Sequence, residues 1–334
     1  MKRILDMLLI GAAAFAVTAT AAQAQNWKPS KPITIIVPWA AGGATDQVTR
    51  LTAKELEAAL GTTIVVVNQP GASGSIGKKS VAEGPKDGYT WTAGAPKQLG
   101  TYKLLGLFDT DVKNWHLFLN VTNVPLVSVK PDAPYKDMGE LLAAMKEKPG
   151  QITVGTAGAT SSGHIAMEAI AQATGVTYRH VPYDGGNPAV ISTVSGETNA
   201  TTQLASEQAE MIRGKRLRPL AVVGNVSLEL GDYKVEPITK WAPKLPDVAT
   251  HFGILIPKGV PAEVIATLDK VWAEKISKSE ALQKYASERG ALFTPYYGDD
   301  AQKRVWPTIQ ADAWMLHAAG RTKMSPEEVG IAKP

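Results

Sequence analysis

Two short turns combine small residues and exposed backbone amides in a way that suits the binding of an anion. The first runs from Trp39 to Asp46, between the β-branched run at residues 33–37 and a helical pattern. A helix that begins directly after a strand offers free N–H groups and the positive end of its dipole to a negative charge. Gly42 and Gly43 let a ligand approach the backbone closely. An ordinary strand-to-helix turn, capped by Asp46, explains the same residues equally well from spacing alone.

The second turn, residues 155–162, repeats this arrangement later in the chain. It contains Gly158 and the hydroxyls of Thr160 and Ser161, just before a helix that includes His164. We interpret His164 as a packed or capping histidine more readily than as a base. If the two turns face each other, they form a clamp for an anion.

Other polar and aromatic residues are candidates for the walls of such a site. Tyr183 and Asp184 follow the end of a predicted strand, where they can line a cleft. Trp39, Trp91 and Lys97 could recognise an aromatic group or a second carboxylate by stacking or charge pairing. Core packing or surface exposure explains each of these three residues equally well.

Several kinds of chemistry lack the residues they need. The chain has no cysteine and no paired histidine spacing, which excludes thiol chemistry and argues against a metal site. Ser162 and His164 lie two positions apart on a helix and point away from each other, and no nucleophile elbow is present. Neither turn carries a phosphate-binding fingerprint. The formal net charge of +4 is spread along the chain, which gives no reason to expect nucleic acid.

The first 24 residues have the layout of a signal peptide. Lys2 and Arg3 precede an apolar run at residues 7–17, and Ala22-Gln23-Ala24 forms a small-residue cleavage site. A retained N-terminal anchor is the alternative. Removal of residues 1–24 leaves about 310 residues, which is enough for two lobes with separate cores. We therefore expect a secreted, periplasmic protein.

The rest of the chain alternates between strand and helix patterns. A strand over 33–37, a helix that ends at Gly61 and a strand over 64–67 predict a βαβ unit. The alternation continues to a last helix over about 299–319, and Pro307 predicts a kink or a split in it. This pattern favours an α/β fold.

These residues, in this order and spacing, resemble the substrate-binding proteins of tripartite tricarboxylate transporters, the Bug or TctC family. The resemblance spans nearly the whole mature chain. It is carried by residues 31–33, 36–39, 42–46, 68–74 and 87–90, and then by 149–150, 155–158, 164, 181–183, 196 and 257–261.

The resemblance implies a two-lobed α/β periplasmic binding protein of the type II, Venus-flytrap kind, in which each lobe is a mostly parallel sheet flanked by helices. A small carboxylate ligand would be held mainly by loop backbone, hydroxyls and ordered water. No cofactor or metal is implied, and the partners are membrane permease subunits of such a transporter. The ligand-binding residues that we predict are Trp39, Ala40, Gly42, Gly43, Thr45, Asp46, Ala95, Pro96, Lys97, Gly158, Ala159, Thr160, Ser161, His164, Tyr183, Asp184 and Gln203.

Two departures from the family pattern leave the identity of the carboxylate open. Trp39 stands where a smaller aromatic residue is common, and Gln203 stands about where many members carry an acidic residue. We assign residues 25–122 and 236–334 to lobe 1 and residues 123–235 to lobe 2, with crossings near 119–125 and between 224 and 237.

Two other functions remain open at this stage. A sensor receptor that docks on a signalling protein would use the same closed form, and we expect a monomer in either case. A periplasmic hydrolase or lyase would need an activated nucleophile or a paired acid and base, and the sequence offers neither.

Overall fold

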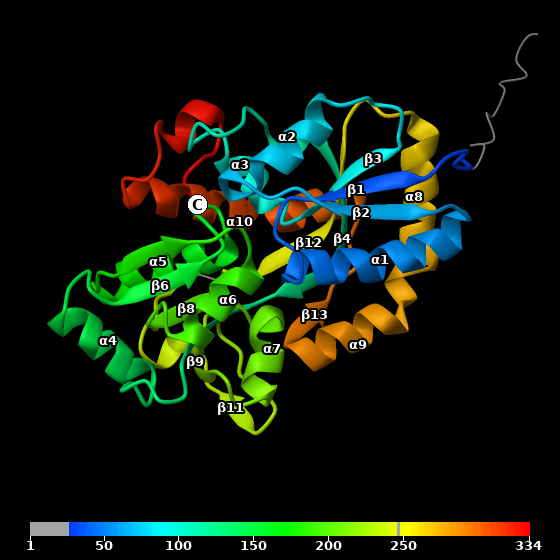
Figure 1. Ribbon diagram of the computed structural model, residues 1–334. Helices are drawn as coiled ribbons and strands as arrows, with labels where there is room; N and C mark the ends of the chain where they lie inside the picture. Colours follow the sequence, from blue (N-terminus) through cyan, green and yellow to red (C-terminus); the bar gives the residue numbers. More distant parts are fainter. Residues whose placement is uncertain (1–26, 246–247) are drawn as a thin grey trace, which may run out of the picture.

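The computed structural model describes residues 27–245 and 248–334, and the predicted signal peptide lies outside these ranges. Two bodies lie side by side, and each is a β-sheet with helices on both faces (Figure 1). Within the described ranges, no helix is long and apolar enough to cross a membrane.

The first body is built on a six-stranded sheet. Its strands, in spatial order, are β13 (Ala291–Phe293), β4 (Trp115–Asn123), β12 (Thr250–Pro257), β3 (Thr90–Gly94), β1 (Ile33–Val37) and β2 (Ile64–Asn68). The predicted strand over residues 33–37 is β1 itself. Ile33, Ile35 and Val37 are fully buried because this strand lies inside the sheet, as its continuous β-branched run indicates.

Helices cover both faces of this sheet. One face packs against α1 (Ala44–Leu60), α8 (Ala262–Glu274) and α9 (Glu280–Arg289). The other packs against α2 (Ser75–Glu83), α3 (Lys97–Thr101) and α10 (Gly298–Ala318). Short 3-10 turns occur at Ala72–Gly74, Val112–Asn114, Ile276–Lys278 and Pro326–Val329. Helix α1 ends at Gly61, as predicted, with a left-handed φ of 65° that glycine adopts without strain.

The second body is built on a five-stranded sheet. Its strands, in spatial order, are β7 (Arg179–Pro182), β6 (Thr153–Thr156), β8 (Ala200–Leu204), β5 (Pro125–Val129) and β9 (Arg218–Val222). Helices α4 (Met138–Glu147) and α5 (Ser162–Thr174) share one core with this sheet. Helices α6 (Gly186–Ser195) and α7 (Ala205–Arg213) share the other. A hairpin of β10 (Leu228–Leu230) and β11 (Tyr233–Val235) and a 3-10 turn at Ile238–Lys240 complete this body.

The two-body α/β architecture is confirmed, but the expectation of mostly parallel sheets needs correction. Strand β1 is parallel to β2 and β3, and β6 is parallel to β7 and β8. The remaining pairings are antiparallel. The reason is connectivity. The strand by which the chain enters the second body, β5, and the strand by which it returns, β12, are each inserted between strands of opposite direction. Both sheets are therefore mixed.

The nine-residue strand β4 has no counterpart among the predicted elements. Its residues 115–123 include two asparagines and a histidine, which weaken a β-strand pattern. In the structure Asn120 is fully buried and donates through Nδ2 to the hydroxyl of Thr52, 2.8 Å away. Tertiary partners for the polar side chains therefore override the local preference.

The chain passes from the first sheet to the second through Val124, between β4 and β5 and inside the predicted interval 119–125. It returns in β12, which begins at Thr250. Ile238, Ala242 and Val248 still pack in the core of the second body. We therefore propose that the second boundary of lobe 2 lies near residue 249 and not near 236.

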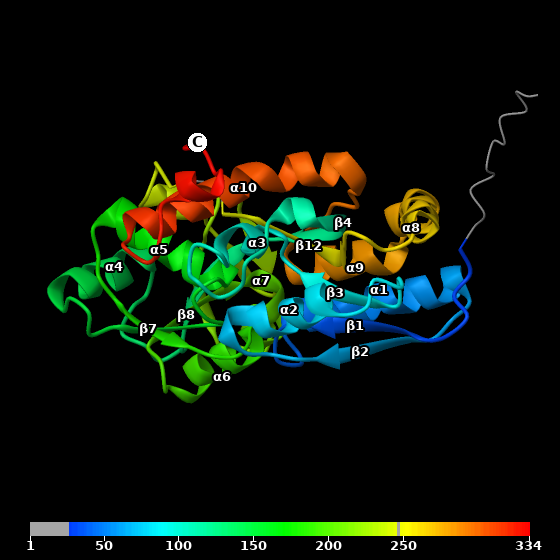
Figure 2. The ribbon, with the colours of Figure 1, turned by 90° about the horizontal axis from the view of Figure 1, so that it is seen from above.

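Helix α10 is a third connection between the bodies. It runs as one helix across Pro307, so the predicted split does not occur. Its earlier residues pack on the first sheet, while Met315 and Leu316 pack in the core of the second body. Figure 2 shows α10 reaching from the first body to α5.

Candidate functional site

The two predicted turns line the same cavity at the junction of the two bodies, and loops beside them form hydrogen bonds across this junction. The backbone N–H of Ala159 donates to the hydroxyl of Ser73 at 3.0 Å, and the Thr160 hydroxyl donates to the Ser73 carbonyl at 2.9 Å. The Ala40 amide donates to the Asp184 carbonyl at 2.9 Å. These bonds join loops of different bodies, so the structure is a closed arrangement.

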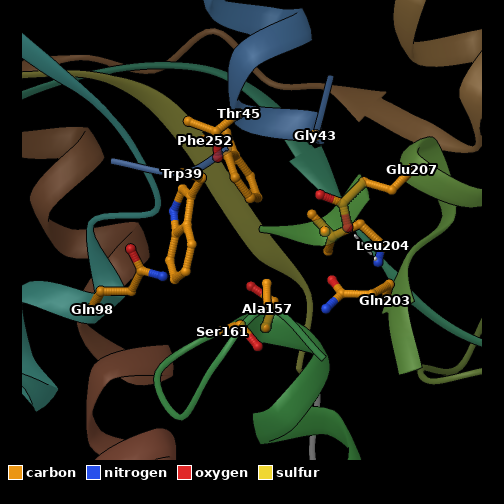
Figure 3. A pocket seen from close by; sticks show the side chains of 12 residues that line it. Trp39, Gly43, Thr45, Gln98, Ala157, Ser161, Gln203, Leu204, Glu207 and Phe252 are labelled. Carbon is orange, nitrogen blue, oxygen red and sulfur yellow. Dashed lines mark hydrogen bonds between the residues drawn. The ribbon is translucent and has the colours of Figure 1, made fainter. Parts of the chain in front are cut away.

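A cavity of about 30 Å³ lies between the turns. Its walls come from both bodies (Figure 3). The residues that line it are Trp39, Gly43, Thr45, Gln98, Ala157, Ser161, Ser162, Gly186, Gln203, Leu204, Glu207 and Phe252. A space of this size holds about two water molecules. A ligand therefore has to part the two bodies in order to enter.

Helix α5 presents its N-terminus to the cavity. Ser161 is the N-cap, and its hydroxyl accepts from the His164 amide at 3.1 Å. The amides of the first helical turn have no intrahelical partner, and the positive end of the helix dipole lies there. Ser161 and Ser162 line the cavity directly. This end of the cavity can donate hydrogen bonds to a carboxylate.

The N-terminus of helix α1 was expected to form the other side of an anion clamp, but it is not free to bind a ligand anion in this arrangement. Its N-cap is Gly43, which has no side chain to cap the helix, and the Ala44 amide donates to Glu207 Oε1 at 2.9 Å. Asp46 is not the cap, and its Oδ2 accepts from the Gly42 amide at 3.0 Å. A carboxylate of the protein's own already occupies the anion position at α1, so the expectation that both turns are open to a ligand is wrong for this arrangement.

Glu207 extends from α7 and lines the cavity. Its side chain is half-buried, with its exposed part facing the cavity. Its Oε2 accepts from the Leu204 amide at 3.3 Å. The Gln203 side-chain amide is oriented so that its oxygen accepts from the Ala157 amide and its NH₂ group donates to the same Glu207 oxygen at 2.8 Å. A Cβ on Gly186 would lie 1.9 Å from Glu207 Oε1, so glycine there leaves room for the carboxylate. Burial raises the pKa of Glu207 to about 7.

The opposite wall carries Gln98, and a buried lysine lies behind it. Lys78 is fully buried and donates to the Ala95 carbonyl at 3.2 Å and to Gln98 Oε1. Since its oxygen accepts from Lys78, Gln98 turns its Nε2 group toward the Thr160 carbonyl, 3.3 Å away. Burial lowers the pKa of Lys78 to about 7.

Trp39 and Phe252 supply apolar surface. Both are buried, 6% and 4% exposed, and both rings face the cavity (Figure 3). A Cβ on Gly74 would lie 3.0 Å from the Trp39 ring, so the ring is held tightly against the turn that precedes α2.

Five of the predicted ligand-binding residues line the cavity: Trp39, Gly43, Thr45, Ser161 and Gln203. Five others belong to contacts between the bodies or lie beside them: Ala40, Gly158, Ala159, Thr160 and Asp184. Gly42 lies at the same junction, where a Cβ would meet the Asn187 side chain at 3.2 Å.

The other predicted residues do not line the cavity. Lys97 forms a buried ion pair with Asp312 at 2.9 Å, and the His164 ring stacks on His180 with centroids 4.0 Å apart. Asp46 pairs with Arg50 at 2.9 Å. The Ala95 carbonyl accepts a hydrogen bond from Lys78, and Pro96 is the N-cap residue of α3. Tyr183 is half-buried at the end of β7, where its amide donates to the Thr156 carbonyl at 2.8 Å.

Seven cavity residues are missing from the predicted set. Ala157 and Ser162 belong to the predicted second turn, while Gln98, Gly186, Leu204, Glu207 and Phe252 do not belong to either turn. Glu207 carried a weak signal, since an acidic residue at the third position of a helix is typical of a helix start. Within the described ranges, no group of three or more potential metal ligands occurs.

Comparison with known proteins gives concordant results. Residues 48–311 match the family model described as tripartite tricarboxylate transporter family receptor. A protein encoded in the tcbD-tcbE intergenic region of Pseudomonas sp. (strain P51) is 32% identical over 77% of both chains. The structure of the periplasmic binding protein BugD has a TM-score of 0.79 at 25% identity and covers 89% of this chain and 100% of its own. An R. palustris protein solved with adipate has a TM-score of 0.77 at 26% identity, covering 87% and 98%.

Proposed function

The chain belongs to the tripartite tricarboxylate transporter receptor family, whose members are binding proteins and not enzymes, and on this premise we propose that it captures a small carboxylate between its two lobes and delivers it to the membrane subunits of such a transporter. We propose that it acts in the periplasm as a monomer, after removal of residues 1–24.

The observation that carries this proposal is the donor-rich end of the cavity between the two bodies. Gln98, Ser161 and Ser162 line the cavity there, at the N-terminus of α5, and Gln98 has a second N–H beside the one that donates to the Thr160 carbonyl. Hydrogen bonds to a carboxylate from such donors are charge-assisted and stronger than neutral ones. The relative solved with adipate, a carboxylate, supports the same ligand class.

The small size of the cavity supports a cycle of opening and closure. A ligand that contacts both bodies stabilises the closed form and shifts the equilibrium toward it. The few hydrogen bonds between Ser73 and the second turn are weak enough to break, since a typical hydrogen bond contributes only about 1 kcal/mol.

The test is a thermal-shift panel of small carboxylic acids on the mature protein, followed by calorimetry. A true ligand at about 100 times its dissociation constant should add about 2.7 kcal/mol of stability. The panel should contain monoacids, diacids, a tricarboxylic acid, aromatic acids and amino acids, with uncharged amides of the same acids as controls. Equal shifts from acids and amides, or no shift from any acid, would contradict the proposal.

A further inference from the structure

We propose that the cavity selects a zwitterion, a small ligand whose carboxylate lies toward Gln98, Ser161 and Ser162 and whose protonated amino group lies toward Glu207. The inference deepens the proposed receptor function and rests on it, because it names the class of carboxylate that the same cavity takes.

The first step is the distribution of charge around the cavity. Among the twelve described residues that line it, Glu207 is the only one with an ionisable side chain. The lysine that the sequence suggested for pairing with a second carboxylate, Lys97, is paired with Asp312 instead. A diacid would therefore bring its second negative charge toward a carboxylate in a wall without a cation, and like charges at close range repel strongly away from bulk water.

The second step is the opposite wall, which combines hydrogen-bond donors with a buried lysine behind them. Lys78 has no ion-pair partner within 4 Å in the described part of the chain, and its Nζ group lies directly behind Gln98. Its hydrogen bond fixes the Gln98 amide with the oxygen toward Lys78 and the Nε2 group toward the cavity side, where one N–H donates to the Thr160 carbonyl and the second N–H is left for a ligand. The N-terminus of α5 adds the positive end of its dipole beside them. This wall favours a carboxylate.

The third step is the wall formed by Glu207. Its two oxygens accept hydrogen bonds from two backbone amides and from Gln203, all of them neutral donors. No cation lies within 4 Å of it among the described residues, so the charge is only partly compensated. A buried charge without an opposite charge is costly. An ammonium group on the ligand supplies the missing opposite charge at the cavity surface of Glu207.

The walls together are bipolar, with Gln98 on one side and Glu207 on the other (Figure 3). Trp39 and Phe252 line the space between these poles with apolar surface, which suits the carbon skeleton of the ligand. The complementary guest carries one charge of each sign, separated by a short apolar segment.

The experiment uses matched probes that differ in one terminal group. These are propionate, β-alanine and succinate for a short skeleton, butyrate, 4-aminobutyrate and glutarate for a longer one, and L-alanine for amino and carboxylate groups on one carbon. Calorimetry on the wild type should show that at least one zwitterion binds more tightly than the monoacid and the diacid of the same skeleton. The Glu207→Gln variant should lose at least about thirtyfold in affinity for that zwitterion, because it removes one partner of an enclosed charge pair.

Glu207→Gln keeps the size of the side chain, and circular dichroism should confirm that it folds. The control is Glu229→Gln, which removes a negative charge from an exposed side chain of β10, in the same body and outside the cavity. It should leave the affinities unchanged. Tighter binding of diacids than of zwitterions by the wild type, or an unchanged zwitterion affinity in Glu207→Gln, would overturn the inference and leave the receptor function standing. If no probe and no acid of the wider panel binds, the proposed function fails with it.

Discussion

Single charged residues in this protein take their roles from burial and from their nearest neighbours. Lys97 lies in the interior with its ammonium against Asp312, so it connects α3 to α10 instead of facing a ligand. Glu207 lies in a helix start that the sequence marks only weakly, yet it is the charged group at the cavity. Residue type alone does not separate these two cases, because both are ordinary surface residues in most proteins.

The first prediction at this scale concerns the Lys97–Asp312 pair. Lys97→Met should destabilise the protein by about 3–5 kcal/mol, since it leaves a buried carboxylate without its partner. The double variant Lys97→Met with Asp312→Leu should recover most of that loss, because neither charge remains to be desolvated. Guanidinium unfolding followed by circular dichroism measures both. If the single and double variants have equal free energies of unfolding, the unpaired Asp312 carboxylate is not the cause of the lost stability.

The second prediction concerns the pH dependence of stability. The pKa of Glu207 is raised by burial to about 7 in the folded state, so the folded protein binds more protons than the unfolded chain between about pH 4.5 and 7. Its contribution to stability should therefore be present at low pH and be lost as the pH rises to about 7.

The size of this contribution should be about 3 kcal/mol, and it should be absent from Glu207→Gln. Tyr285, the neighbouring ionisable group on α9, has a pKa raised to about 12 and does not titrate in this range. Unfolding curves of both proteins from pH 4.5 to 8 provide the measurement. Parallel pH profiles for wild type and variant would contradict the assignment.

Among the elements, α5 decides the donor end of the cavity, and its position depends on close packing. A Cβ on Gly163 would lie 1.9 Å from the Thr202 carbonyl oxygen of β8. Glycine at this position lets the first turn of α5 approach the sheet, and this contact places Ser161 and Ser162 at the cavity. The sequence suggested the helix but contained no sign of this approach.

We therefore expect Gly163→Ala to shift α5 away from β8. The variant should lose about 2–3 kcal/mol of stability and most of its carboxylate affinity, since overpacking forces backbone to move. Gly175→Ala, at the other end of the same helix, is the matched control. Its φ of 70° makes alanine strained by about 1 kcal/mol, but nothing lies within 4 Å, so ligand affinity should persist. Calorimetry measures the carboxylate affinity of both variants. A loss of affinity in Gly163→Ala alone indicates that the first turn of α5 has moved, whereas backbone strain by itself would leave affinity unchanged.

At the scale of the whole molecule, the two bodies are joined by two crossings of the chain, by helix α10, and by contacts between loops and helices. The connections are Val124, the stretch before Thr250, and α10. The loop contacts centre on Ser73 and the second turn. Removing a loop contact should change how often the bodies separate, because it takes away a contact between them and leaves the packing of each sheet and its helices in place.

Thr160→Val removes the hydroxyl that bonds to the Ser73 carbonyl. We expect a shift toward an open form, which small-angle X-ray scattering would detect as a larger radius of gyration without ligand. Ligand affinity should fall by about three- to tenfold, the equivalent of one hydrogen bond. Thr174→Val, whose hydroxyl bonds only within its own helix to Ile170, is the control. An unchanged radius of gyration together with unchanged affinity would contradict this role for Thr160.

The sequence by itself determined the alternation of strands and helices, the helix ends at glycines and the positions of the two glycine-containing turns in the chain. These features depend on local periodicity and on the backbone freedom of particular residues, such as Gly61 and Gly175, which both adopt left-handed conformations. The resemblance to a receptor family rested on such turns, and the family model confirms it.

Only the tertiary structure decided which charges face the ligand cavity. The strand β4, the antiparallel insertion of β5 and β12, and the packing of Val248 in the core of the second body depend on contacts between residues far apart in the chain. Glu207 and the Ala44 amide, 163 positions apart, are brought together across the junction of the two bodies. Local sequence patterns do not encode such distances, because the net effect of a charge depends on the dielectric and on the partners that surround it after folding.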